Sequence, residues 1–259
     1  MRMARNKDRV KIATGDLDFS VPGVCREVQE VARLAGSFLQ PGSARVAEEI
    51  GTNLRSFARS KRRGKWTWSV AETDPIRTKL TRAYEPEERR GANAVWGELS
   101  FTWTIVLVHP EPDAAFSISG NASNKICIKM QEPEGGTVLL AQWQFEIGDA
   151  RSPGCHFHVG LCRAGNETPF PHWLTVPRLP SILIMPVDAL DFLLGEIFQQ
   201  EWKACVSREN DHTRALFASQ RDRLTRLLAW KRDEVIKSSG SAWSWLKHRH
   251  PDAELFTNC

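Results

Sequence analysis

The sequence predicts an α+β protein with an N-terminal helical hairpin, an antiparallel meander of four to five strands, and two long C-terminal helices packed on the sheet. Three observations predict this class. Apolar residues recur every three to four positions between residues 24 and 57, alternate with polar residues between 95 and 161, and return to helical spacing after residue 186. The links between the alternating segments are short, which favours antiparallel pairing, because parallel neighbours need a crossover of about a dozen residues. Such an order is typical of α+β layers.

The first 20 residues are polar and charged, and we expect them to form a flexible arm. The next helix is predicted from Val24 to Phe38, where apolar side chains recur at helical spacing. Gln40, Pro41 and Gly42 end it, and Ser43 is the expected N-cap of a second helix. The apolar stripe of that second helix consists of Val46, Ile50, Leu54 and Phe57.

Period-two alternation begins at Val95 and predicts a half-buried strand that ends before the His109-Pro110 turn. We expect residues 116–119 to form a brief edge strand, residues 120–121 a turn, and residues 125–130 the next strand. Two longer strands then form a hairpin between Thr137 and Cys162. Its odd-numbered residues are expected to face the core: Leu139, Trp143, Phe145, Ile147, Phe157, Val159 and Leu161.

Helical spacing returns after Pro186, which suits a first helical turn, and continues as a broad apolar stripe to Trp202. Asn210 and Asp211 are expected to cap a further long helix. The organisation is therefore predicted as an arm over residues 1–20, a helical basic region over 21–92 and an α+β body over 93–259. The last two segments are alternatively one continuous domain.

The order of helix, four-strand meander and later helices resembles that of ubiquitin-conjugating enzymes and RWD domains. The resemblance is one of topology. Such enzymes carry a His-Pro-Asn element followed by a catalytic cysteine, whereas here His109-Pro110 is followed by Glu111. Neither Cys127 nor Cys162 stands at that family's usual spacing behind it. The resemblance therefore implies an architecture and no activity.

Charge is distributed unevenly along the chain, whose formal net charge is +4. Residues 1–92 hold 19 Lys and Arg against 12 Asp and Glu, whereas residues 93–200 hold 5 against 11. No secretory signal follows the charged N-terminus, no segment approaches the roughly 18 apolar residues of a membrane span, and no CxxC pair occurs among the six cysteines. We therefore expect a cytoplasmic protein with reduced thiols and no membrane partner.

The leading functional interpretation is a soluble binding or scaffold protein that contacts nucleic acid or another polyanion and needs no cofactor. Basic side chains neutralise phosphates and tryptophans stack on unpaired bases. Alternatively, these cations simply lie at the solvated end of a helix. The sequence does not indicate whether the nucleic acid would be DNA or RNA. The residues expected to bind are Arg55, Arg59, Lys61, Arg62, Arg63, Lys65, Trp66 and Trp68.

An alternative interpretation is a metal-assisted hydrolase or phosphodiesterase built on His156 and His158. Residues two apart on a strand point the same way, and two neutral imidazoles on one face bind a divalent metal or share proton transfer. His172 is the expected third member, with Glu167 as a substitute. Against this stands the interpretation that both histidines make ordinary structural hydrogen bonds.

Two further interpretations are open. Cys127 lies between Lys125 and Lys129, which would lower the pKa of a nucleophilic thiol, although an inert thiol is favoured. The chain is also compatible with a structural subunit that binds a protein partner in a larger assembly and exposes tryptophan on its surface.

Overall fold

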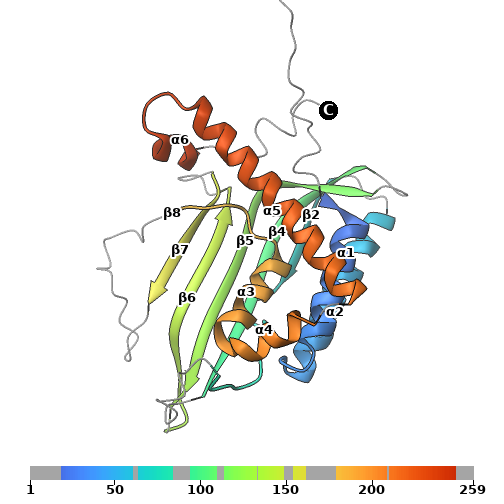
Figure 1. Cartoon of the computed structure of the whole chain (residues 1–259), viewed down its shortest axis with the longest axis vertical. Helices are drawn as coiled ribbons and strands as arrows, with labels where there is room; N and C mark the ends of the chain where they lie inside the picture. The colour runs from blue at the N-terminus through green and yellow to red at the C-terminus, as the bar shows by residue number, and fades with distance from the viewer. Residues whose placement is uncertain are drawn as a thin grey trace, which may run out of the picture.

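The computed structural model describes residues 19–60, 64–83, 94–109, 114–132, 134–148, 154–161, 179–208 and 210–248. In this part of the chain one antiparallel sheet carries a layer of helices on one face (Figure 1). The α+β class is thus confirmed. The predicted flexible arm lies almost wholly outside the described residues.

The helices are α1 (Val21–Ala35), α2 (Pro41–Arg59), α3 (Pro186–Phe198), α4 (Gln200–Val206), α5 (Asp211–Lys237) and α6 (Ala242–His248). The strands are β1 (Phe19–Ser20), β2 (Lys65–Val70), β3 (Ile76–Arg77), β4 (Val95–His109), β5 (Ala115–Gln131), β6 (Thr137–Ile147), β7 (His156–Leu161) and β8 (Leu179–Pro180). The order in the sheet is β2-β4-β5-β6-β7-β8, while β1 also pairs with β5 and β3 with β4. The predicted meander is β4 to β7.

The helical hairpin of α1 and α2 is present, but its second cap differs from the prediction. Ser20 caps α1 by accepting a hydrogen bond from the Gly23 amide. The helix α2 begins at Pro41, so Ser43 lies inside its first turn and the prediction that Ser43 is the N-cap is wrong. The Ser43 hydroxyl instead accepts a hydrogen bond from the Arg77 amide at 2.8 Å and so ties α2 to β3.

The predicted edge strand and turn near residue 120 are also wrong, because β5 runs unbroken from Ala115 to Gln131 between β4 and β6. Gly120 has a φ of +101°, and the pairing with β4 shifts register between Trp103 and Ile105. A glycine that accepts a positive φ allows the strand to bulge without leaving the sheet.

Residues of the predicted basic region extend the sheet. The strand β2 pairs antiparallel with β4, so the part of the chain before residue 92 shares a sheet with the part after it. Trp68 of β2 is 1% exposed, and its indole N–H donates to the Ile50 carbonyl oxygen at 3.2 Å. This bond fixes α2 over the start of the sheet.

The helices cover the face of the sheet that carries the odd-numbered residues of β4 and β7 and, from Ala141 onward, those of β6. Leu193 of α3 lies against Gly97 of β4, and Phe192 makes edge contacts with Trp143 and Phe145 of β6. Figure 1 shows β6 and β7 extending beyond the helix layer. Trp143, Phe145 and Phe157 therefore face the side that the alternation predicts, although Trp143 and Phe145 are only half-buried. The prediction that Leu139 faces the core is wrong, because a register shift in the pairing of β5 with β6 places Leu139 opposite Lys129 and the buried Val138 opposite Met130.

The helices α3 and α5 in the C-terminal part of the chain pack against different elements. Gln199, with a φ of 42°, separates α3 from α4 within the apolar stripe. Asn210 caps α5 as predicted, accepting from the Thr213 amide at 2.9 Å. The helix α3 lies on β4 and β5, whereas α5 packs mainly on α1. Among the described residues, no helix has the length and apolar character that crossing a bilayer requires.

Candidate metal centre

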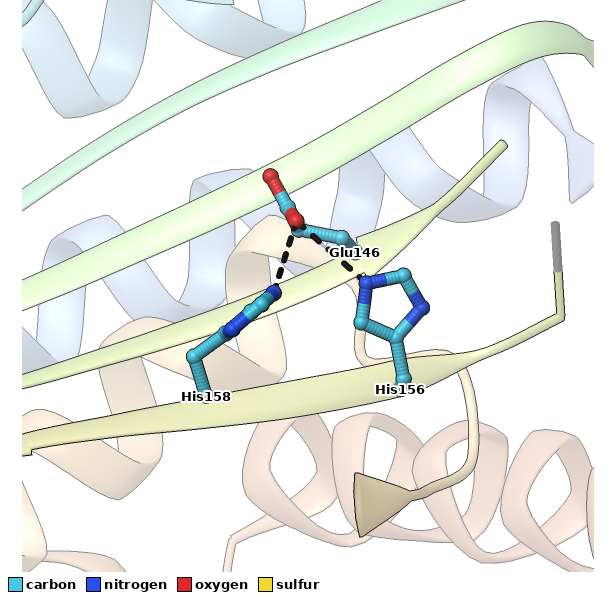
Figure 2. A group of neighbouring side chains, drawn as sticks. All are labelled: Glu146, His156 and His158. Carbon is cyan, nitrogen blue, oxygen red and sulfur yellow. Dashed lines mark hydrogen bonds and ion pairs between the residues drawn. The ribbon is translucent and has the colours of Figure 1, made fainter. Parts of the chain in front are cut away.

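Three ionisable side chains meet on the face of the sheet that is turned away from the helices. In the register of the hairpin, Glu146 lies opposite His156 and Gln144 opposite His158. Successive residues of a strand point to opposite faces. Since Phe145 contacts α3, Glu146 points away from the helices, and His156 and His158 share its face (Figure 2).

The three groups are close enough to hold one ion. The Nε2 atom of His158 lies 3.1 Å from Glu146 Oε2, and the Nε2 atom of His156 lies 3.4 Å from the same oxygen. One ligand atom from each of the three residues falls within 4.8 Å of the others. Figure 2 shows both imidazoles converging on one carboxylate oxygen. Two imidazoles and one carboxylate form a donor set found in catalytic metal sites.

The Nδ1 atom of His156 determines which tautomer the neutral imidazole adopts. Nδ1 lies 2.8 Å from the Gly154 carbonyl oxygen, which accepts hydrogen bonds and cannot donate one. Nδ1 therefore carries a proton, and in the neutral ring Nε2 presents its lone pair to the carboxylate. An imidazole whose Nδ1–H is held by a carbonyl is oriented as metal-binding histidines are.

The Nε2 atom of His156 is also without a hydrogen bond among the described residues. The side chain is 2% exposed, so bulk water does not compensate for the missing partner. Its separation of 3.4 Å from Glu146 Oε2 satisfies the distance of an ion pair but not the alignment of a hydrogen bond. Two acceptors that face each other in a buried site require a proton or a metal ion between them.

The remaining oxygen of Glu146 is held by its neighbours. Gln144 donates from Nε2 to Oε1 at 2.5 Å, and the Ser123 hydroxyl donates to the same oxygen at 3.4 Å. The imidazoles of His156 and then His158 hold the pKa of Glu146 far below its ordinary value of 4.5, although burial opposes this. Glu146 is thus ionised, with Oε1 satisfied by the protein and Oε2 directed at the two rings.

A second group of charged residues lies elsewhere on the same face of the sheet. Glu98 of β4 binds Lys129 at 2.6 Å and Arg77 at 3.0 Å. Burial raises the pKa of Glu98, but hydrogen bonds from Lys129 and Trp96 outweigh it, so that the pKa lies below its usual range. The helix-free face is therefore a polar surface with paired charges.

The structure brings together a set that sequence reasoning found only in part. His156 and His158 share a face, as predicted. His172 and Glu167, the expected third members, lie outside the described residues. Sequence reasoning missed Glu146. The register of the hairpin could have identified it, because pairing Glu146 with His156 places all three residues on one face.

The basic, tryptophan-containing segment is described only in part. Lys61, Arg62 and Arg63 lie outside the described residues, and Arg55 and Arg59 belong to the last turns of α2. The ring of Trp66 stacks on Phe57 with centroids 4.5 Å apart, and Trp68 is in the core. Neither tryptophan therefore resembles an open stacking platform, and polyanion binding by the cations stays a prediction.

Cys127 is the remaining candidate from the sequence. Its side chain is buried. Burial raises the pKa of its thiol despite the positive charges of Lys125 and Lys129, and a neutral thiol is a poor nucleophile. This environment favours the inert thiol.

Comparisons with protein families, with curated proteins and with solved structures found no match to this chain. The resemblance in topology to ubiquitin-conjugating enzymes is thus without support from a structural match. Functional inference rests on the geometry of the described residues.

Proposed function

We propose that Glu146, His156 and His158 bind one divalent metal ion and that the protein is a metal-assisted hydrolase. The observation that carries this proposal is the Nε2 atom of His156, a buried acceptor without a hydrogen bond that faces a carboxylate oxygen. A metal ion between the two acceptors satisfies both of them.

The spacing of the ligand atoms supports a small ion. Bonds of 2.0–2.1 Å in a tetrahedral site place neighbouring ligand atoms about 3.3 Å apart. The contacts of Glu146 Oε2 with the two imidazoles, at 3.1 and 3.4 Å, lie close to that spacing. Mixed imidazole and carboxylate donors suit Zn²⁺, Fe²⁺ or Mn²⁺ better than Ca²⁺ or Mg²⁺, which prefer oxygen ligands alone.

Three protein ligands leave a coordination position for water, as in catalytic sites. A bound divalent metal supplies the chemistry by lowering the pKa of a water molecule and polarising the bond to be cleaved. The side chains of His158 and Glu146 are 17% and 22% exposed, whereas that of His156 is 2% exposed. A substrate would therefore approach from the side of His158 and Glu146, with Gln144 and Ser123 positioning the carboxylate.

The test is equilibrium dialysis against Zn²⁺, followed by elemental analysis, with Co²⁺ absorption as a report on the ligands. We expect one equivalent in the wild-type protein and a loss of affinity of about 10- to 100-fold or more in His158→Ala. His248→Ala is the matched control, because His248 lies on α6 and its Nδ1 atom is 2.8 Å from the Ser244 carbonyl oxygen of the same helix. Equal binding by wild type and His158→Ala, or no binding by wild type, would contradict the proposal.

The hydrolytic step needs its own measurement. Purified protein loaded with Zn²⁺, Fe²⁺ or Mn²⁺ is assayed on carboxylic ester and phosphodiester chromogens. We expect turnover that EDTA and His158→Ala abolish and His248→Ala preserves. If the protein binds one equivalent of metal but shows no such turnover, the proposal of a hydrolase is refuted and only the proposal of metal binding is supported.

A second proposal is polyanion binding, supported by two exposed cations at adjacent element ends. Arg59 closes α2 and Lys65 opens β2, and both are exposed. Phosphate contacts make binding fall steeply with salt. Affinity for single- and double-stranded DNA and RNA, measured across salt concentrations, should decrease when Arg59, Lys61, Arg62 and Arg63 are replaced by Ala. No binding at low salt would remove the proposal.

A further inference from the structure

A cavity of about 420 Å³ lies in the helix layer between α3, α5 and residues 182–184. Its volume falls in the range of small-molecule sites, which are mostly apolar with a few placed polar groups. The apolar part of its wall consists of Ile182, Ile184, Phe217, Leu224 and Leu227. It is separate from the candidate metal centre, which lies on the other face of the sheet.

The charged groups nearest the cavity are mostly committed to one another. Arg223 donates from Nε and Nη2 to both oxygens of Asp188 and from Nη1 to Glu27 at 2.6 Å. Asp188 also accepts from Gln220 at 3.2 Å and from the Met185 amide at 3.2 Å. These groups have little hydrogen-bonding capacity left for a ligand.

Asp191 differs from Asp188 in having one donor among the described residues. Its Oδ1 atom accepts from the indole N–H of Trp202 at 2.7 Å. Burial raises the pKa of the Asp191 carboxyl, and the charge of Asp188 adds to this, while the bond from Trp202 opposes it. Asp191 lines the cavity, and its second carboxylate oxygen accepts no hydrogen bond from the described residues, so it has the capacity to accept one from a ligand.

The two acids of the cavity wall differ in their pairing. Asp188 and Asp191 both line the wall, and Arg223 pairs with Asp188 and with Glu27, which lies outside the wall. Arg221 also lines the cavity, but its side chain is exposed to solvent. A cation placed beside Asp191 would therefore neutralise a partly buried carboxylate that Arg223 does not reach.

We propose that this cavity binds a small apolar amine, with the ammonium group donating to Asp191 and the hydrocarbon part lying against the apolar wall. Charge-assisted hydrogen bonds of this kind are stronger than neutral ones, and the wall removes the hydrocarbon from water. An apolar carboxylate of the same length is disfavoured by the neighbouring acids. The site thus selects by charge at one end and by apolar contact along its length.

The test compares three probes of one length: hexylammonium, 1-hexanol and hexanoate, titrated into the full chain at pH 7 and followed by protein-observed NMR. We expect saturable binding of hexylammonium about tenfold or more tighter than that of hexanol, and weaker binding still for hexanoate. Shifts should appear at Ile182, Ile184 and Phe217. Equal affinity for the amine and the alcohol, or no saturation by the amine, would overturn the proposal.

Asp191→Asn is the decisive variant, because an amide keeps an oxygen for the Trp202 indole while removing the charge. It should abolish the preference for the amine and leave hexanol affinity unchanged. Asp222→Asn, an exposed acid on α5 paired with Arg226, is the matched control and should keep the preference. If Asp191→Asn does not fold, Leu224→Ala tests the wall: it should weaken both probes alike, and unchanged binding would contradict the assignment.

Discussion

Arg223 and His156 are both buried polar side chains, and they differ in how completely their hydrogen-bonding atoms are used. Arg223, between α1, α3 and α5, donates to Glu27 and to both oxygens of Asp188. His156, on the helix-free face, has one nitrogen bonded to a carbonyl and the other without a hydrogen bond among the described residues. Buried polar groups are usually satisfied, so an exception calls for an explanation. The first cluster holds three helices together, and the second contains the buried acceptor to which we propose that a metal ion binds.

The largest expected effect comes from breaking the satisfied cluster. Arg223→Ala would leave Glu27 and Asp188 buried without their shared cation, and removing one partner of a buried ion pair costs about 3–5 kcal/mol. We expect that loss in the free energy of unfolding measured by urea denaturation. Arg226→Ala, four residues away from Asp222 on the exposed side of α5, should cost about 0.5 kcal/mol or less. Comparable losses in the two variants would show that the buried cluster has no special role.

Adding metal should stabilise the other cluster. A ligand that binds only the folded state at 100 times its dissociation constant raises the free energy of unfolding by about 2.7 kcal/mol. We expect that gain with Zn²⁺ in the wild type and in Arg226→Ala, and its disappearance after EDTA or in His158→Ala. A gain that persists in His158→Ala would place the metal elsewhere.

The two faces of the sheet are compared most directly at two glycines. A Cβ at Gly97 would lie 2.9 Å from Cγ of Leu193 in the covered face, whereas a Cβ at Gly160 would meet Gln142 at 3.6 Å, an ordinary contact. Overpacking a core costs about 1–3 kcal/mol, so Gly97→Ala should lower the free energy of unfolding by that amount. Gly160→Ala, on the face of the histidines, should change it by about 0.5 kcal/mol or less. Equal effects would mean that the polar face is packed as tightly as the core.

The structural features that the sequence predicts correctly are those that depend on the spacing of residues close together in the chain. Alternation in residues 137–161 places the two histidines on the face opposite Phe145. Asn210 marks the start of α5 because its side chain caps that helix. Glu146 was not found because it joins His156 only through the hairpin register. That register depends on where the strands end and not on the pattern within either strand.

The prediction failed elsewhere for related reasons. Gly120 and Asn121 have the composition of a turn, yet β5 continues through them because the chain pairs with β4 on both sides, from Ala115 to Ile118 and again from Ala122. The bonds of Arg223 to Glu27 and Asp188 span 196 and 35 residues, and no local pattern marks such partners. The N-cap of α2 is Gln40 and not the predicted Ser43, because Pro41 suits the first turn of a helix.

The smallest expected effect is a pH dependence that separates the metal-free cluster from the rest of the chain. Because the pKa of Glu146 is lower in the folded protein than its ordinary value of 4.5, its stabilising contribution is complete above about pH 4.5 and is lost as the pH falls toward the folded value. In metal-free protein the free energy of unfolding of the wild type should therefore fall more steeply below pH 4.5 than that of Glu146→Gln, by about 1 kcal/mol. Urea denaturation of both proteins between pH 3 and 6 measures the difference, and His248→Ala should follow the wild type. Parallel curves for wild type and Glu146→Gln would mean that the imidazoles do not stabilise the carboxylate, and that a metal ion and not a proton is needed to hold the three side chains together.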